Sequence, residues 1–401
     1  MRNHEKAPER SGAFLLCLKK GSLAFLPSRF SISLRNEEAG MDRRVFLGTA
    51  AATALAPTVG WTQDTAGGWV KLPTEPYRGK QDDVVFVDAL TGWYGNGAGK
   101  LFRTTDGGQT WVQQLDRPGT FVRALGFVDA ELGFLGNIGP DYFPNVSDAT
   151  PLYRTRDGGG SWEPVVIDGP AVKGICAIDV LKTPFINAGV LDHRVTIRAA
   201  GRVGGPAFLA TSRDRGETWT SEDLSAHTGM ILDVHFVSEQ VGFICGASSA
   251  EVQASTAVIL RTGDGGRTWS RVHEGGRTFE LTWKMSWPSA TVGYVTVQSY
   301  NPDTTASQRY VAKSVDGGLT WRELPLVDNA AVREFGVGFV DETRGWVGAA
   351  PNGFETTDGG ASWSPVRMGN AVNKVRVIPR PGGGQVVFAI GVELHRLDLP
   401  G

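Results

Sequence analysis

The sequence predicts an all-β fold, a single seven-bladed β-propeller of four-stranded blades that spans residues 64–401. An eight-residue motif (Ser/Thr, any, Asp, any, Gly, any, Ser/Thr, Trp) occurs six times, with its aspartates 42 to 57 residues apart. A second motif, an apolar strand followed by a polar turn and a Gly-aromatic pair, precedes most of these copies. Repeats of this length are typical of folds in which one unit recurs and packs on its neighbours.

The eight-residue motif has the composition of a tight turn between two strands. Its Asp can accept hydrogen bonds from nearby backbone N–H groups, its Gly tolerates positive φ, and its Trp can fill the seam between units. It resembles the Asp-box (BNR repeat) of sialidases, sortilin-like receptors and some glycosidases, which lies between the third and fourth strands of a blade. We expect a structural role, and calcium binding by the aspartates is the alternative. The repeated positions here are Asp106, Asp157, Asp214, Asp264, Asp316 and Asp358, with Trp111, Trp162, Trp219, Trp269, Trp321 and Trp363.

The second motif predicts a further hairpin in each unit. It occurs at 85–93, 126–134, 235–243 and 338–346, and in a degenerate form at 285–294. Because Asp88, Asp129 and Asp341 occupy the same position in it, we interpret them as turn formers. The two strands of this hairpin and the two strands that flank each Asp-box together make four strands per unit. Four-stranded units of this length indicate propeller blades.

Both ends of the chain contribute to a seventh unit. After the sixth Asp-box, 374–378 and 385–397 predict three more strands, and 69–72 resembles the strand that follows a box. We expect this N-terminal strand to complete the last blade, because a closed ring leaves no sheet edge exposed.

The N-terminal region has the features of an export signal. The basic segment 41–47 precedes an apolar, Ala-rich run from Gly48 to Ala56, and Arg43-Arg44 resembles a twin-arginine signal. We therefore assign 1–40 to an upstream or non-native extension and 41–63 to an export signal. The expected location is the periplasm, or the thylakoid lumen in a photosynthetic organism. An unprocessed cytoplasmic tail is the alternative.

Charge and composition narrow the function classes. The chain has 40 Lys and Arg against 42 Asp and Glu, a net charge of −2, which argues against a nucleic-acid partner. No His/Cys cluster has the spacing of metal ligands, so we expect neither a metal nor another cofactor. Cys176 and Cys245 both lie in apolar segments that are expected to form strands, which favours buried free thiols over a disulfide. We expect a monomer.

The pairing of the two motifs resembles the photosystem II stability and assembly factor family over residues 68–400. The resemblance implies a non-enzymatic, exported, seven-bladed propeller. In photosynthetic members it implies binding of a newly inserted reaction-centre subunit during assembly. Relatives also occur in bacteria without photosystem II. We therefore expect a protein client that is membrane-inserted or exported.

Two features predict where such a client binds. Two long insertions, 136–151 and 299–307, lie on the face opposite the Asp-boxes, and the first contains Tyr142 and Phe143. Basic residues recur in the connections that lead to the innermost strands, and they could form a positive rim around the central channel. These residues are Arg78, Arg123, Lys173, Arg277, Arg333, Lys374 and Arg376.

An Asp-box glycoside hydrolase, sialidase-like or β-glucanase-like, is the alternative function. Glycosidases need two carboxyl groups in one cleft. Four acids outside the repeats could approach the channel, yet nothing in the sequence pairs them. The divergent third unit, 179–202, could hold a special site. We therefore predict no catalytic residue. The four acids are Asp179, Asp192, Glu280 and Glu334.

The export signal can be tested directly. We expect replacement of both Arg43 and Arg44 by Lys to leave the protein in the cytoplasm, because twin-arginine export requires the arginine pair. Cell fractionation measures this, and replacement of Arg29 and Arg35 by Lys is the matched control. Normal export of the Arg43/Arg44 variant would exclude the twin-arginine route.

Overall fold

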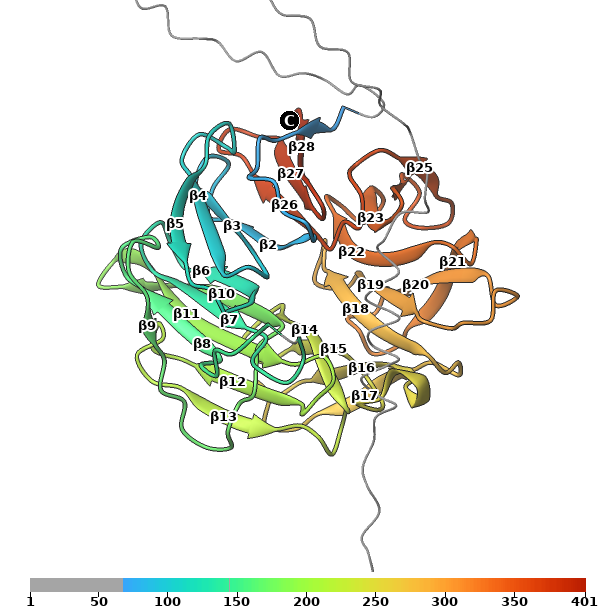
Figure 1. Ribbon diagram of the computed structural model, residues 1–401, viewed down its shortest axis with the longest axis horizontal. Coiled ribbons are helices and arrows are strands. Elements are labelled where there is room, and N and C mark those ends of the chain that lie inside the picture. The colour runs from blue at the N-terminus through green and yellow to red at the C-terminus, as the bar shows by residue number, and fades with distance from the viewer. Residues whose placement is uncertain (1–67, 144) are drawn as a thin grey trace, which may run out of the picture. The chain divides into compact units, whose positions relative to one another are not determined.

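The computed structural model describes residues 68–401, apart from residue 144. All strands in this part belong to seven four-stranded antiparallel sheets arranged as a ring (Figure 1). The predicted seven-bladed propeller is therefore confirmed. The predicted extension (1–40) and export signal (41–63) lie outside the described residues.

The blades follow one another along the chain. Blade 1 contains β2 (Gln81–Phe86), β3 (Gly92–Asn96), β4 (Lys100–Thr104) and β5 (Val112–Asp116). Blade 2 contains β6 (Val122–Phe127), β7 (Gly133–Asn137), β8 (Leu152–Thr155) and β9 (Glu163–Pro164). Blade 3 contains β10 (Ala177–Asn187), β11 (Val190–Gly201), β12 (Phe208–Ser212) and β13 (Thr220–Asp223). Blade 4 contains β14 (Met230–Phe236), β15 (Gly242–Ala247), β16 (Ala257–Thr262) and β17 (Ser270–Glu274), with the short 3-10 helix η1 (Val252–Ala254) before β16.

Blades 5 to 7 complete the ring. Blade 5 contains β18 (Glu280–Ser286), β19 (Gly293–Ser299), β20 (Gln308–Ser314) and β21 (Arg322–Asp328). Blade 6 contains β22 (Arg333–Phe339), β23 (Gly345–Ala350), β24 (Gly353–Thr356) and β25 (Ser364–Val366). Blade 7 contains β26 (Lys374–Pro379), β27 (Gln385–Ile390), β28 (Leu394–Leu399) and the N-terminal β1 (Val70–Lys71).

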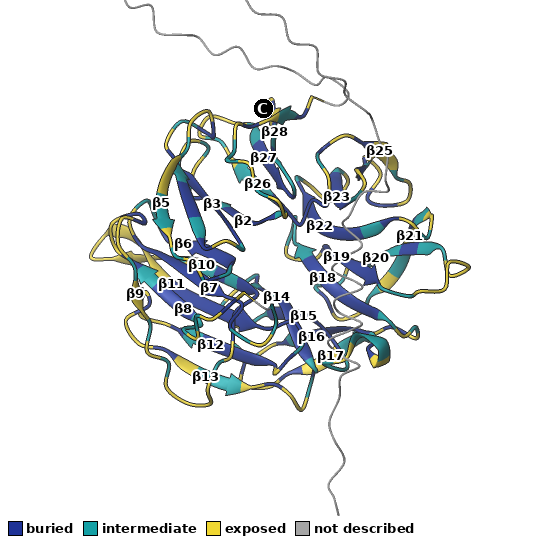
Figure 2. Ribbon diagram, viewed as in Figure 1, coloured by how far each residue is buried: buried dark blue, intermediate teal, exposed yellow. Residues whose placement is uncertain are grey.

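The first strand of each blade lies innermost. β2, β6, β10, β14, β18, β22 and β26 each contact the next one around the ring, and β26 contacts β2. The outer strands are more exposed than the inner and middle ones (Figure 2). The face with the six Asp-box turns and the turns that follow the innermost strands is the box face. The opposite face, where the innermost strands begin, is the mouth face.

The N-terminal strand closes the ring as predicted. β1 pairs antiparallel with β28, Val70 opposite Arg396 and Lys71 opposite His395. The preceding Trp69 is 1% exposed, and its ring meets that of Trp346 from blade 6 edge-on at 5.7 Å. The two ends of the chain therefore hold blade 7 against blade 6 through a buried aromatic contact as well as through the strand pairing.

The second motif has a packing explanation. The ring of Phe86 covers Gly92 on the adjacent strand so closely that a Cβ there would lie 2.4 Å from it. The same contact occurs between Phe127 and Gly133, and between Phe339 and Gly345. The turn aspartates cap the hairpins as predicted. For example, the backbone N–H groups of residues 90 and 91 both donate to the carboxylate of Asp88 at 2.7 Å.

Each Asp-box is a hydrogen-bonded turn. In the first copy Thr104 Oγ1 donates to Asp106 Oδ1 (2.7 Å) and accepts from the N–H of Gly108 (2.9 Å). Both the N–H and the hydroxyl of Thr110 donate to the same carboxylate. These bonds recur in all six boxes. They hold the pKa of the box aspartates low, to about 2 at Asp264, and this engagement within the turn supports the structural interpretation.

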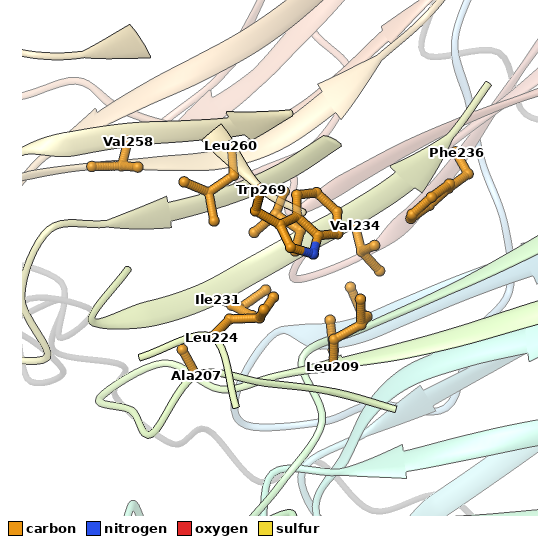
Figure 3. Packing of buried hydrophobic residues seen from close by; sticks show 12 residues of the cluster. Ala207, Leu209, Leu224, Ile231, Val234, Phe236, Val258, Leu260 and Trp269 are labelled. Carbon is orange, nitrogen blue, oxygen red and sulfur yellow. The ribbon is translucent and has the colours of Figure 1, made fainter. Parts of the chain in front are cut away.

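The box tryptophans pack toward the preceding blade. Figure 3 shows Trp269 of blade 4 among Leu209 of blade 3 and Ile231, Val234 and Leu260 of its own blade. Trp219 and Trp269 are buried, whereas the other four box tryptophans are half-buried. The seam between blades therefore depends on these side chains to different extents.

Two further observations concern the described residues. Cys176 and Cys245 are buried free thiols, as predicted. Among residues 68–401, apart from residue 144, no helix is long and apolar enough to cross a membrane.

Ring closure predicts a large effect of a single substitution. We expect Trp69→Ala to lower the free energy of unfolding by about 3–5 kcal/mol, because it empties a buried site between blades 6 and 7. Chemical denaturation measures this, with the half-buried Trp363→Ala as a control that should cost less. An unchanged unfolding midpoint for Trp69→Ala would show that the N-terminal segment does not stabilise the ring.

Candidate binding site at the channel mouth

A cluster of cations surrounds one indole at the mouth face of the channel. Trp283 on β18 is buried, and Lys80 Nζ lies 5.4 Å from its ring centroid. Arg123 Cζ lies 5.2 Å and Lys284 Nζ 6.0 Å from the same ring. Phe335 of β22 meets the indole edge-on at 6.0 Å. Because these five residues come from blades 1, 2, 5 and 6, side chains fill the channel here; we call them the mouth cluster.

Positive charge exceeds negative charge in the mouth cluster. Asp82 receives a hydrogen bond from Arg123 Nη1 at 2.6 Å and lies 3.9 Å from Lys80 Nζ. Lys284 Nζ lies 3.3 Å from Asp233 Oδ1 and donates to a backbone carbonyl. Three cations therefore share two carboxylates. Burial lowers the pKa of Lys80 to about 7, the Asp82 carboxylate opposes the shift, and the other two cations add to it.

The first insertion folds over this cluster. The ring of Phe143 stacks on Phe121 at 4.8 Å and meets Tyr142 edge-on at 4.7 Å. Arg202 Nη1 donates to the carbonyl of Pro140 at 2.8 Å, which ties the loop to blade 3. Burial raises the pKa of Tyr142 above its usual range. Both predicted aromatic residues are half-buried, so they line the mouth and do not project from it.

The second insertion borders the same opening. Tyr300, at its start, interacts electrostatically with Tyr142 and Arg123, and burial raises its pKa. The guanidinium of Arg333 lies 4.5 Å from the Tyr300 ring. The exposed Lys173 is next to the first insertion, since its carbonyl closely approaches Gly139. Tyr142, Tyr300, Arg333 and Lys173 thus border the mouth cluster with mixed aromatic and basic surface.

The structure divides the predicted rim into two groups. Lys374 and Arg376 both pair with the buried carboxylate of Asp83, and Arg277 bonds Glu280 and Glu323 at 2.7 Å each. These three and Arg123 are engaged within the fold. Lys173 and Arg333 border the opening, and Arg78 is exposed two residues before Lys80. A binding role for the seven residues stays a prediction.

Sequence reasoning missed Lys80, Trp283, Lys284 and Phe335. None of them occupies a repeated position of the Asp-box, and they come together only because the ring brings the starts of their strands to one end of the channel. The one available signal was Trp283, a tryptophan outside the Asp-boxes that directly precedes a lysine.

The four candidate acids occupy three different places. Asp179 accepts from His235 Nδ1 at 3.0 Å between blades 3 and 4, and Asp192 is exposed near the end of the β10–β11 hairpin. Glu280 is the first residue of β18, Glu334 is the second residue of the adjacent innermost strand β22, and the two interact electrostatically. They are 4% and 0% exposed, so neither faces an open cleft.

Metal binding finds no support in the described part of the chain. Over residues 68–401 without residue 144, no group of three or more His, Cys, Asp or Glu side chains could hold a metal ion.

Comparison with solved structures identifies propellers of similar fold. No protein-family model and no curated protein matches the sequence. A structure of YCF48 bound to a D1 peptide is 17% identical, with a TM-score of 0.55 over 85% of this chain and 98% of that chain. The chain resembles YCF48 in fold. YCF48 from Cyanidioschyzon merolae is 15% identical, with a TM-score of 0.54 over 83% of this chain and 98% of that one.

A glycosidase propeller is also similar. An ancestral GH74 enzyme is 16% identical, with a TM-score of 0.54 over 81% of this chain but 45% of that chain. The resemblance to the photosystem II assembly factor propeller predicted from the motifs is confirmed at the level of the fold, over nearly all of YCF48. The shared fold does not by itself separate a binding propeller from an enzyme.

Glu334 makes the stability depend on pH in a predictable direction. Its side chain is fully buried, neither carboxylate oxygen has a hydrogen-bond partner, and burial raises its pKa from 4.5 to about 8. Between these values the unfolded chain releases a proton that the folded chain keeps. The free energy of unfolding therefore falls as pH rises through this window, by at most about 1.4 kcal/mol per pH unit.

Glu334→Gln should remove this dependence. We expect the variant to match the unmodified protein near pH 4.5 and to be more stable at pH 8 and above, as measured by urea unfolding across the range. Glu131→Gln, at an exposed turn position, is the control. An identical pH profile for Glu334→Gln and the unmodified protein would contradict the assignment.

Proposed function

We propose that this protein binds an extended segment of a protein client at the mouth face and catalyses no reaction. The observation that carries the proposal is the mouth cluster with its surrounding aromatic and basic side chains. Its three basic groups share two carboxylates, so this end of the channel has a positive potential that favours an anionic group of a client. Because the cluster itself is largely buried, the client would contact the side chains that border it, the exposed Lys173 and the half-buried Tyr142, Tyr300 and Arg333. The solved complex of YCF48 with a D1 peptide, in a propeller of similar fold, supports a peptide-like client.

The expected setting of this binding is outside the cytoplasm. We propose export through the signal at 41–63, with the periplasm or thylakoid lumen as the destination and a membrane-inserted or exported protein as the client. The motif pairing supports this proposal, because it resembles a family of exported assembly factors. Photosystem II itself is the client proposed only for a photosynthetic organism.

Glycoside hydrolysis is the second candidate. It is favoured by one observation, the pair Glu280 and Glu334, whose pKa values are both raised by burial as those of catalytic acids often are. Two observations argue against hydrolysis. Arg277 Nε donates a hydrogen bond to Glu280 Oε1 at 2.7 Å, and the side chains of Glu280 and Glu334 are both buried. We therefore propose that this pair is structural.

Affinity capture from native membranes with crosslinking tests client binding. We expect one specific membrane protein to be captured by the unmodified protein and lost from a Lys173→Glu/Arg333→Glu variant, because the added carboxylates repel an anionic segment. The matched control is Arg271→Glu/Arg322→Glu, at exposed positions of the outermost strands β17 and β21 directly after Asp-boxes. Equal loss of the captured protein in the control variant would indicate a nonspecific effect of charge. Equal capture by the unmodified protein and both variants would exclude the mouth face as the binding site.

The same preparation separates the two candidate functions. We expect no hydrolysis of sialosides or β-glucans. Turnover that Glu280→Gln or Glu334→Gln abolishes would overturn the proposal in favour of a glycosidase.

A further inference from the structure

Blade 3 carries a hairpin that projects beyond the other blades at the box face. β10 and β11 have 11 and 12 residues, compared with 6 or 7 for the first strand of every other blade. Their pairing continues out to Asn187 opposite Val190, and Ala188 and Gly189 form the turn with positive φ. From Pro184 to Arg194 every residue is exposed, so this part of the hairpin packs on nothing in the described chain.

The end of this hairpin is apolar on both of its faces. Phe185, Ile186, Val190 and Leu191 are 39%, 68%, 67% and 61% exposed, and we call them the apolar tip. Ile186 lies directly opposite Leu191, so these two share one face. Phe185 and Val190 lie on the other face, because neighbouring residues of a strand point in opposite directions. A strand that packed on the ring would bury one of these faces, which this hairpin does not do.

Other exposed apolar side chains lie on the same face of the propeller. Leu90 belongs to the turn after β2, and Val315 and Leu319 belong to the fifth Asp-box; they are more than half exposed. Together with the apolar tip they make up seven of the nine large hydrophobic side chains that are exposed in residues 68–401, leaving out residue 144. The box face thus presents separate apolar side chains around one projecting hairpin.

Basic side chains lie at the base of the hairpin. Arg194 of β11, with Arg213 and Arg267 from the third and fourth Asp-boxes, lines a cleft of about 710 Å³ between blades 3 and 4. All three are exposed, as is Lys182 at the start of the projecting segment of β10.

The carboxylates of this cleft are engaged internally. Glu239 accepts from the hydroxyls of Thr183 and Thr196 at 3.1 and 3.0 Å. Asp264 accepts from the hydroxyls of its own box. Burial raises the pKa of Glu222, the third acid. The three acids are half-buried, whereas Arg194, Arg213 and Arg267 are exposed, so the guanidinium groups are the outermost charges of the cleft.

We infer that the box face docks on an anionic lipid bilayer, with the apolar tip inserted among the acyl chains. A flat protein surface could cover only one face of the hairpin, whereas the lipid phase surrounds both. Four side chains on two strands are also too few for a stable contact between protein chains, which buries about 1,200 Å² or more. The basic residues lie where the lipid headgroups would be, as in other interfacial anchors that combine apolar insertion with basic charge.

This inference is independent of the proposed function. The box face and the mouth face are at opposite ends of the channel, so a docked propeller keeps its mouth face open to water. Failure to bind lipid would leave client binding untouched, and failure to capture a client would leave bilayer docking untouched.

Vesicle flotation of the full chain tests the inference. We expect binding to phosphatidylcholine vesicles to increase when phosphatidylglycerol is added and to weaken with salt. A Phe185→Ser/Ile186→Ser/Val190→Ser/Leu191→Ser variant should bind at least about ten-fold more weakly, because the inserted apolar area is gone. Lys182→Gln/Arg194→Gln should lose about five-fold per charge, selectively on anionic vesicles. Val166→Ser, an exposed valine that follows β9, is the control.

A site-specific measurement separates the hairpin from the leader, which all variants share. Ile186→Trp should add fluorescence that brominated lipid quenches, beyond the quenching of the unmodified protein. Equal flotation of the tip variant and the unmodified protein, or no added quenching, would overturn the inference. Loss of self-association in the tip variant, measured by sedimentation, would overturn it in favour of a second copy as the partner.

Discussion

Closure of the ring is the constraint on which the rest of this structure depends. Each blade buries its apolar surface only because another blade stands on either side, so an open array would expose two of these surfaces and two strand edges. Here the pairing of β1 with β28 supplies the last contact, and the buried Trp69–Trp346 pair extends it to blade 6. β1 and β28 are separated by more than three hundred residues in the sequence.

The channel mouth is a direct consequence of that closure. Lys80, Arg123 and Phe335 lie in different blades, and they come within about 6 Å of the Trp283 ring only when the seven innermost strands stand in a ring. Burial disfavours the charged forms of the basic side chains, so desolvation affects their pKa values as much as the ion pairs do. Because positive charge exceeds negative charge in the mouth cluster, it can attract an anionic ligand. An ion-pair network with equal numbers of positive and negative charges would not.

The two faces of the propeller differ in the loops and side chains that they present. The mouth face carries two insertions, the first of which folds over the channel, together with basic and aromatic side chains. The box face is built from short, internally bonded turns, and its one long projection is the apolar β10–β11 hairpin. Similar folds serve peptide binding in YCF48 and hydrolysis in GH74 enzymes, so the chemistry of these faces, not the fold, has to identify the function.

The sequence by itself determined the blade count, the turn chemistry and the closing strand. These follow from local rules: an Asp that caps its own turn, as Asp106 does, and a Gly that accepts a Phe ring on the adjacent strand, as Gly92 does, are needed in every blade and therefore repeat. Tertiary structure alone decided which basic residues are free. Arg123, Lys374 and Arg376 look alike in sequence to Lys173 and Arg78, yet their carboxylate partners Asp82 and Asp83 come from another blade. The residues on which the two proposals rest do not repeat, such as Trp283 and the hairpin around Ile186. Their neighbours are set by the geometry of the closed ring, and no local pattern encodes it.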